Sequence, residues 1–200
     1  AAEVRLDARR RESLDHGLSL VRNGPFGLEG AVRKGRLDAA GMERALARLR
    51  PTLDIAEGVR DAQVVFESVP EIVERKIEVL REIEAAALPD AVIASNTSSI
   101  MIGELGRALV NVERLVGTHW FYPSNVMPLV EVARADQSAP WAVDLIVGYL
   151  GAIGKKPVVE RREKACGING SGTILKACEM LTSIRAVQQK AIFTENEERI

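Results

Sequence analysis

The sequence predicts an open α/β fold in which a mostly parallel sheet carries helices on its faces. Short apolar runs alternate along the chain with longer segments whose apolar residues recur at helical spacing. Some of these short runs are continuously apolar, which is typical of parallel strands that are buried on both faces. The chain has 200 residues, enough to bury a sizeable core.

The N-terminal part of the chain predicts one strand and two helices. AAEVRL forms a short strand that ends at Asp7. Residues 13–24 and 38–51 have apolar positions at helical spacing, and Asp38 is placed to be the N-cap of the second helix. The glycines between the two segments mark turns.

Strands and helices alternate from residue 62 onward. Pro70 opens the first helix of this part, and Gly154 ends a later one. The expected strands are 62–69, 91–97, 114–121, 128–133 and 156–160, and the expected helices are 71–87, 101–109, 139–154 and 173–191.

Composition excludes several classes of partner. The net charge of −1 does not favour a nucleic acid or a membrane surface. The two cysteines, Cys166 and Cys178, form neither a disulfide framework nor a metal cluster, which fits a reducing, cytoplasmic location. No apolar stretch reaches the ~18 residues of a membrane span, and the N-terminus lacks the features of a signal peptide. We expect a small-molecule substrate and no metal.

Ligands of open α/β sheets bind beyond the carboxyl ends of the strands. This rule selects Asp7, residues 67–71, residues 95–99 and His119 as site candidates.

His119 and Glu131 interrupt two apolar runs, where a titrating side chain needs a reason. Each lies six positions from Asn125, at the centre of a turn-like segment. If the two runs form a hairpin, the two side chains face each other, and the carboxylate holds the imidazole in one tautomer as a general base. A histidine held by structural hydrogen bonds explains the pattern equally well.

Two polar segments follow predicted strands, and each has a simpler structural interpretation. SNTSSI presents hydroxyls and backbone N–H groups at a strand end, but Ser98 or Ser99 would also serve as a helix N-cap. Glu71 and Lys76 lie in the first turns of the next predicted helix, where a solvated helix with a capped end is the alternative. Spacing alone favours the structural interpretation of both segments.

The segments ESVPEIVERK, ASNTSS, GTHWFYP, PLVEV and GKKPVV together resemble the NAD-binding domain of the 3-hydroxyacyl-CoA dehydrogenase family, from Asp7 to Pro157. The resemblance implies a Rossmann-like fold. Residues 1–160 would form a partial dinucleotide-binding domain, and residues 161–200 a helical segment of unassigned role.

The resemblance also implies a role for each site residue. His119 would accept the proton of the 3-hydroxyl group, Glu131 would be its carboxylate partner, and Ser98 would bind the substrate oxygen. Asp7 would bind the adenosine ribose, which favours NAD over NADP. The remaining matches are Glu71, Lys76, Asn96 and again Ser98 for the cofactor, and Asn169 for the substrate.

The implied reaction is NAD-dependent interconversion of (S)-3-hydroxyacyl-CoA and 3-oxoacyl-CoA in the β-oxidation of fatty acids. Two alternatives stay open. A carnitine- or gulonate-type dehydrogenase of the same superfamily would act on a small hydroxy acid. A truncated relative would be a non-catalytic interaction module.

The sequence departs from the family pattern at four places. The glycine-rich GxGxxG turn and the first strand precede the segment that matches Ala1 to Leu6, so we expect a central strand to be missing and two neighbours to be left unpaired. Tyr122 replaces an asparagine, and RREKACGINGSG replaces the motif PGFxxNR. We also expect the family's helical C-terminal domain, which supplies a dimer interface, to be absent, although a homo-oligomer stays an expectation.

Overall fold

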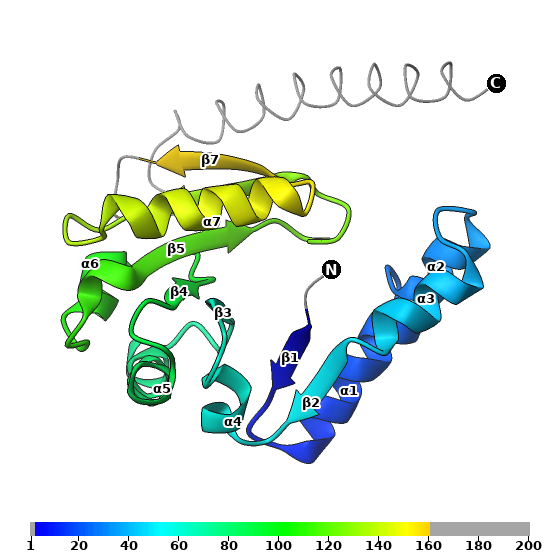
Figure 1. Cartoon of the computed structure of the whole chain (residues 1–200), viewed down its shortest axis with the longest axis horizontal. Helices are drawn as coiled ribbons and strands as arrows, with labels where there is room; N and C mark the ends of the chain where they lie inside the picture. Colours follow the sequence, from blue (N-terminus) through cyan, green and yellow to red (C-terminus); the bar gives the residue numbers. More distant parts are fainter. Residues whose placement is uncertain (1–2, 161–200) are drawn as a thin grey trace.

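The computed structural model describes residues 3–160, whose strands form two sheets (Figure 1). The smaller sheet is a parallel pair of β1 (Val4–Asp7) and β2 (Leu49–Thr52). The larger has the order β3-β4-β5-β6-β7, and only β5 and β6 are antiparallel neighbours. Its strands are β3 (Val64–Glu67), β4 (Val92–Ser95), β5 (Leu115–Trp120), β6 (Leu129–Ala133) and β7 (Lys156–Glu160).

Helices cover both faces of the larger sheet. One apolar cluster joins α5 and α6 to one face through residues such as Leu80, Ile93 and Leu105, and a second joins α7 to the other face through residues such as Val116 and Ile146. The helices are α1 (Arg11–Asn23), α2 (Leu28–Arg33), α3 (Ala39–Leu46), α4 (Ile55–Val59), α5 (Val73–Ala86), α6 (Ile102–Gly106) and α7 (Pro140–Ala152). The expected α/β fold with a mostly parallel sheet is therefore confirmed.

The two sheets are separate because no strand among residues 3–160 joins β1 to β3. The residues of β3 are mostly half-buried, whereas those of the neighbouring β4 are all buried. The expectation of two strands left without a second partner is thus met. Helix α4 contacts both β1 and α5, and Arg9 forms ion pairs with Glu78 and Glu82 of α5. These contacts connect the smaller sheet to the larger one.

The predicted helix over 38–51 is wrong at its C-terminal end. Asp38 is indeed the N-cap, but α3 ends at Leu46, and Leu49–Thr52 forms β2. The run LRPT contains a proline, which an edge strand tolerates because one side of its backbone needs no ladder hydrogen bonds. Helices α2 and α4 were also not expected.

None of the helices in the described part is long and apolar enough to cross a membrane. The predicted helix over 173–191 and residue Asn169 lie outside the described residues.

Candidate active site

The hairpin of β5 and β6 places His119 directly opposite Glu131 in the strand register. His119 Nδ1 lies 3.0 Å from Glu131 Oε2, and the two side chains are 14% and 4% exposed. The geometry predicted from their equal spacing about Asn125 is confirmed. Because the carboxylate occupies Nδ1, Nε2 is the ring nitrogen left for a ligand.

Gly117 lets α6 approach β5 closely. Side chains alternate along a strand, so Gly117 and His119 share the face that α6 covers. A Cβ atom on Gly117 would lie 2.7 Å from Ile102 Cδ1 and 3.1 Å from Ala133 Cβ. The missing side chain therefore makes room for Ile102 at the start of α6, and this positions the serine-containing segment that precedes α6.

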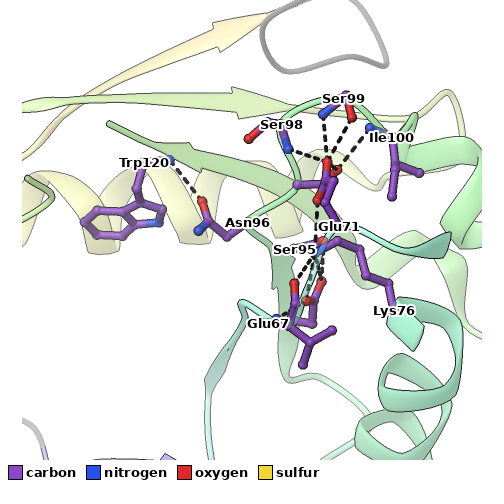
Figure 2. Close-up of polar contacts among 11 residues, drawn as sticks. Glu67, Glu71, Lys76, Ser95, Asn96, Ser98, Ser99, Ile100 and Trp120 are labelled. Atoms are coloured by element: carbon purple, nitrogen blue, oxygen red, sulfur yellow. Dashed lines mark hydrogen bonds and ion pairs between the residues drawn. The ribbon is translucent and has the colours of Figure 1, made fainter. Parts of the chain in front are cut away.

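That segment, residues 97–99, is held by a single carboxylate, as Figure 2 shows. Glu71 Oε1 accepts hydrogen bonds from the backbone N–H groups of Ser98 and Ser99, both at 2.9 Å, and from the hydroxyl groups of Thr97 and Ser99. The Ser98 hydroxyl points away from Glu71 in the same view. Ser98 therefore has its backbone fixed and its hydroxyl free to meet a ligand.

The alternative that Ser98 or Ser99 caps the helix is wrong. The N-cap of α6 is Met101, and it makes no side-chain capping hydrogen bond. The hydroxyl of Thr97 instead accepts a backbone hydrogen bond here, from the N–H of Ile100 at 3.0 Å.

Glu71 is stabilised as a carboxylate. Partial burial alone would raise its pKa, but hydrogen bonds from Thr97, Ser99 and Ser98, with the charge of Lys76, outweigh that effect and lower the pKa to about 2. Glu71 is consequently ionised at any physiological pH, and its negative charge holds the serine segment.

Lys76 lies inside the protein, with a side chain only 1% exposed. Its Nζ atom donates to both oxygens of the buried Glu67, at 2.9 and 3.2 Å, and to the carbonyl of Val69, and it lies 3.4 Å from Glu71 Oε2. A solvated helix is therefore the wrong description of this position. Direct contact between Lys76 and a bound ligand would require some of these bonds to open.

Asn96 connects the serine segment to the hairpin of β5 and β6. Its Oδ1 atom accepts from the backbone N–H of Trp120 at 3.1 Å, next to His119 (Figure 2). Ser95 of β4 and Gly117 of β5 are paired in the sheet. His119 follows Gly117 and the serine segment follows Ser95, so both lie at the same edge of the sheet.

Asp7 lies on the other sheet, at the exposed carboxyl end of β1. Desolvation raises its pKa, and the charges of Asp54 and Glu82 add to this effect while Arg9 opposes it. A carboxylate at a strand end is a suitable acceptor for ribose hydroxyl groups. Residues 3–160 contain no group of three or more His, Cys, Asp or Glu side chains arranged to hold a metal ion.

Lys155 contacts the loop between β5 and β6, and the sequence did not single it out beyond its place in the motif GKKPVV. Its Nζ donates to the carbonyls of Ser124 and Met127 and lies 5.7 Å from the centre of the Trp120 ring. Partial burial lowers its pKa. Lys155 therefore fixes the loop between His119 and Glu131.

The tip of this loop also meets the turn before α2. Asn125 Nδ2 donates to the carbonyl of Phe26, and the Phe26 and Tyr122 rings contact edge to face at 5.6 Å. A cavity of about 260 Å³ lies between the two segments, and its lining includes Lys34 and Arg36. This cavity is open and borders the loop that joins the two catalytic candidates.

Comparisons with known proteins identify the family to which this chain belongs. The family model of the 3-hydroxyacyl-CoA dehydrogenase NAD-binding domain matches residues 1–163. The alpha subunit of the fatty acid oxidation complex of Pseudomonas putida (strain F1) is 44% identical over 128 residues, which are 64% of this chain and 18% of that subunit. The chain therefore spans less than a fifth of the length of this curated relative.

Solved structures show the same fold. The crystal structure of FadB2 from M. tuberculosis matches with a TM-score of 0.78 and 30% identity, over 94% of this chain and 64% of that one. (S)-3-hydroxybutyryl-CoA dehydrogenase PaaH1 from Ralstonia eutropha matches with a TM-score of 0.74 and 27% identity, over 78% and 54% of the two chains. With a family model that covers residues 1–163, the chain belongs to the 3-hydroxyacyl-CoA dehydrogenase family, as its NAD-binding domain.

Proposed function

We propose that this chain supplies the cofactor site and the proton-transfer groups of an NAD-dependent dehydrogenase that interconverts (S)-3-hydroxyacyl-CoA and 3-oxoacyl-CoA. The observation that carries the proposal is the partly buried contact between His119 and Glu131 at 3.0 Å, at the same sheet edge as the serine segment. Family membership supplies the class of reaction.

In this proposal His119 is the general base. Its Nε2 atom accepts the proton of the substrate's 3-hydroxyl group while Nδ1 stays bonded to Glu131, which stabilises the imidazolium that forms. The Ser98 hydroxyl donates a hydrogen bond to the same oxygen. Bound NAD supplies the hydride acceptor at its nicotinamide ring. In the reverse direction His119 returns the proton to the oxygen.

The residues at the sheet edge fit the nicotinamide half of NAD. Asn96 uses Oδ1 for Trp120, so its Nδ2 group is the one offered to the cofactor. Glu71 binds the segment that contains Ser98. The ammonium of Lys76 is buried, so we propose that Lys76 affects the cofactor site indirectly, through its ion pair with Glu71. Asp7 would bind the adenosine ribose. No glycine-rich GxGxxG turn occurs in residues 3–160, and so we assign no group to the pyrophosphate.

The cavity beside the catalytic loop favours a CoA ester over a small hydroxy acid. Lys34 and Arg36 in its lining offer two cations to the phosphate groups of CoA. Asn125 and Val126 also line the cavity and belong to the loop between His119 and Glu131, so the cavity adjoins the loop that carries the proposed base. A role in fatty acid oxidation is part of this proposal, because the relative from Pseudomonas putida is named as the alpha subunit of a fatty acid oxidation complex. The cytoplasmic location expected from the two cysteines is part of the same proposal.

The test is reduction of acetoacetyl-CoA by this chain, followed as loss of NADH absorbance. We expect turnover in the unmodified chain and a loss of ~10²–10⁴-fold for His119→Gln, the usual range for removal of a general base. The only other histidine, the exposed His16 of α1, gives the matched control His16→Gln, which should keep full activity. Full activity in His119→Gln, or turnover of CoA-free hydroxy acids alone, would contradict the proposal.

A further inference from the structure

A continuous series of polar contacts leads from the interior of the protein to Ser98 (Figure 2). Glu67 holds Lys76 at 2.9 and 3.2 Å, Lys76 lies 3.4 Å from Glu71, and Glu71 accepts the N–H of Ser98 at 2.9 Å. Three successive contacts therefore connect a fully buried carboxylate to the residue proposed to bind the substrate oxygen.

Glu67 is the fixed end of this series. It is 2% exposed, and its two oxygens accept the N–H of Val69 at 2.7 Å, the hydroxyl of Ser95 at 2.5 Å and two contacts from Lys76. These bonds join the end of β3, the loop that carries Glu71, and the end of β4. Glu67 therefore fixes both the loop that carries Glu71 and the end of β4, from which the serine segment continues.

The negative charge of Glu67 is what this arrangement requires. The Lys76 ammonium is buried. It makes two contacts with Glu67 and one longer contact with Glu71. A neutral amide at residue 67 would offer one accepting oxygen where four contacts now exist. The Lys76 ammonium would then draw toward Glu71, the nearest remaining carboxylate, and pull it from the serine segment.

We propose that Glu67 is a positioning residue, which acts through Lys76 and Glu71 to hold the backbone of Ser98 in place. Because Glu67 is 2% exposed, we assign it no contact with substrate or cofactor. The further statement that Ser98 then meets the substrate oxygen rests on the proposed function.

Amide hydrogen exchange measured by NMR on the full chain tests this without any turnover. Glu67→Gln should raise the exchange rates of the Ser98 and Ser99 amides about tenfold or more relative to the amides of β5. Glu67→Asp, which keeps the charge on a shorter side chain, should restore part of the protection. The matched control is Glu84→Gln, since Glu84 is a carboxylate that accepts backbone N–H groups, those of Val110 and Asn111, away from the site.

Kinetics provide the second measurement. Glu67→Gln should lower kcat with acetoacetyl-CoA about tenfold per folded molecule. Glu67→Asp should recover part of kcat. A role limited to overall stability would lower the amount of folded protein and leave kcat per folded molecule unchanged.

The outcomes separate this proposal from the proposed function. Faster exchange confined to Ser98 and Ser99 supports positioning even if the unmodified chain reduces no acetoacetyl-CoA, a result that would sink the proposed function alone. Equal acceleration of the β5 amides, or no change, overturns the positioning role. If Glu67→Gln does not fold, Ser95→Ala decides in its place: it removes one bond to Glu67, and unchanged Ser98 exchange in that variant overturns the proposal.

Discussion

The side chains of His119 and Glu131 meet across β5 and β6, with Nδ1 3.0 Å from Oε2. Glu131 is buried and His119 is half-buried, and the contact uses Nδ1, which leaves Nε2 for a ligand. A carboxylate in this position fixes the tautomer of the ring and stabilises its protonated form. The pair is therefore expected to act as one unit.

Replacing Glu131 tests whether it acts only through His119. Glu131→Gln keeps the shape of the side chain and removes its charge, so we expect kcat to fall about tenfold to hundredfold, as hydrogen bonds to charged groups contribute about 1.5–3 kcal/mol. The double variant His119→Gln/Glu131→Gln should be no slower than His119→Gln alone, because the carboxylate acts only through the ring. Steady-state kinetics of the four proteins measure this. Additive losses would show that Glu131 acts independently of His119.

The strands and the pairing of His119 with Glu131 could be predicted because local patterns specify them. His119 and Glu131 stand at equal distances from Asn125 within two apolar runs, and a hairpin with that centre must place them face to face. The larger sheet follows from the alternation of apolar runs and helical segments. β2 escaped prediction because LRPT is short, polar and contains a proline, and its pairing with β1 depends on residues far away in sequence.

The anchoring of Ser98 could not be derived from spacing. Lys76 shares an apolar stripe of α5 with Leu80 and Ile83, and this was the one local sign that it is buried. Its burial depends on Glu67, which lies on another element, and the series continues through Glu71 to a loop after β4. Ion pairs of this kind form only when tertiary packing has brought three segments together, so the sequence left a solvated helix as the simpler interpretation.

The low pKa of Glu71 predicts a specific dependence of stability on pH. The pKa falls from the ordinary 4.5 to about 2 in the folded chain, so folding favours the ionised form. This contribution is complete above about pH 4.5 and is lost as the pH falls toward 2. The stability difference between the unmodified chain and Glu71→Gln should therefore shrink across this range, as measured by urea unfolding at a series of pH values.

Asp7 supplies a control of opposite sign. Desolvation raises the pKa of Asp7, and the nearby charges of Asp54 and Glu82 add to that effect. Folding therefore favours its protonated form, a contribution present at low pH and lost as the pH rises through the raised pKa. Asp7→Asn should stabilise the chain at neutral pH and have little effect in acid. The same sign for both variants would contradict these two shifts.

Lys34 and Arg36 should affect CoA substrates selectively. Both line the cavity beside the catalytic loop, and both are exposed, so each ion pair with a phosphate contributes about 0.2–1 kcal/mol. We expect Lys34→Gln and Arg36→Gln each to raise the KM for acetoacetyl-CoA by up to about fivefold at low salt, and the effect should fade as salt screens the charges. Arg33→Gln, an exposed cation of α2 outside the cavity lining, is the control. An equal rise in all three variants would exclude a role specific to the cavity.

Gly117, the one glycine within the described strands, should resist replacement by alanine. A Cβ atom there would lie 2.7 Å from Ile102 Cδ1 and 3.1 Å from Ala133 Cβ. The Ala133 Cβ cannot move away unless the backbone of β6 moves with it. Gly117→Ala should therefore displace α6 and cost about 1–3 kcal/mol of unfolding free energy, the range for overpacked cores. Gly148→Ala in α7 meets no atom within 4 Å and should instead gain up to about 1 kcal/mol from helix propensity. Denaturant unfolding compares the two, and equal stabilities would show that Ile102 yields without cost and that the close approach of α6 does not depend on glycine.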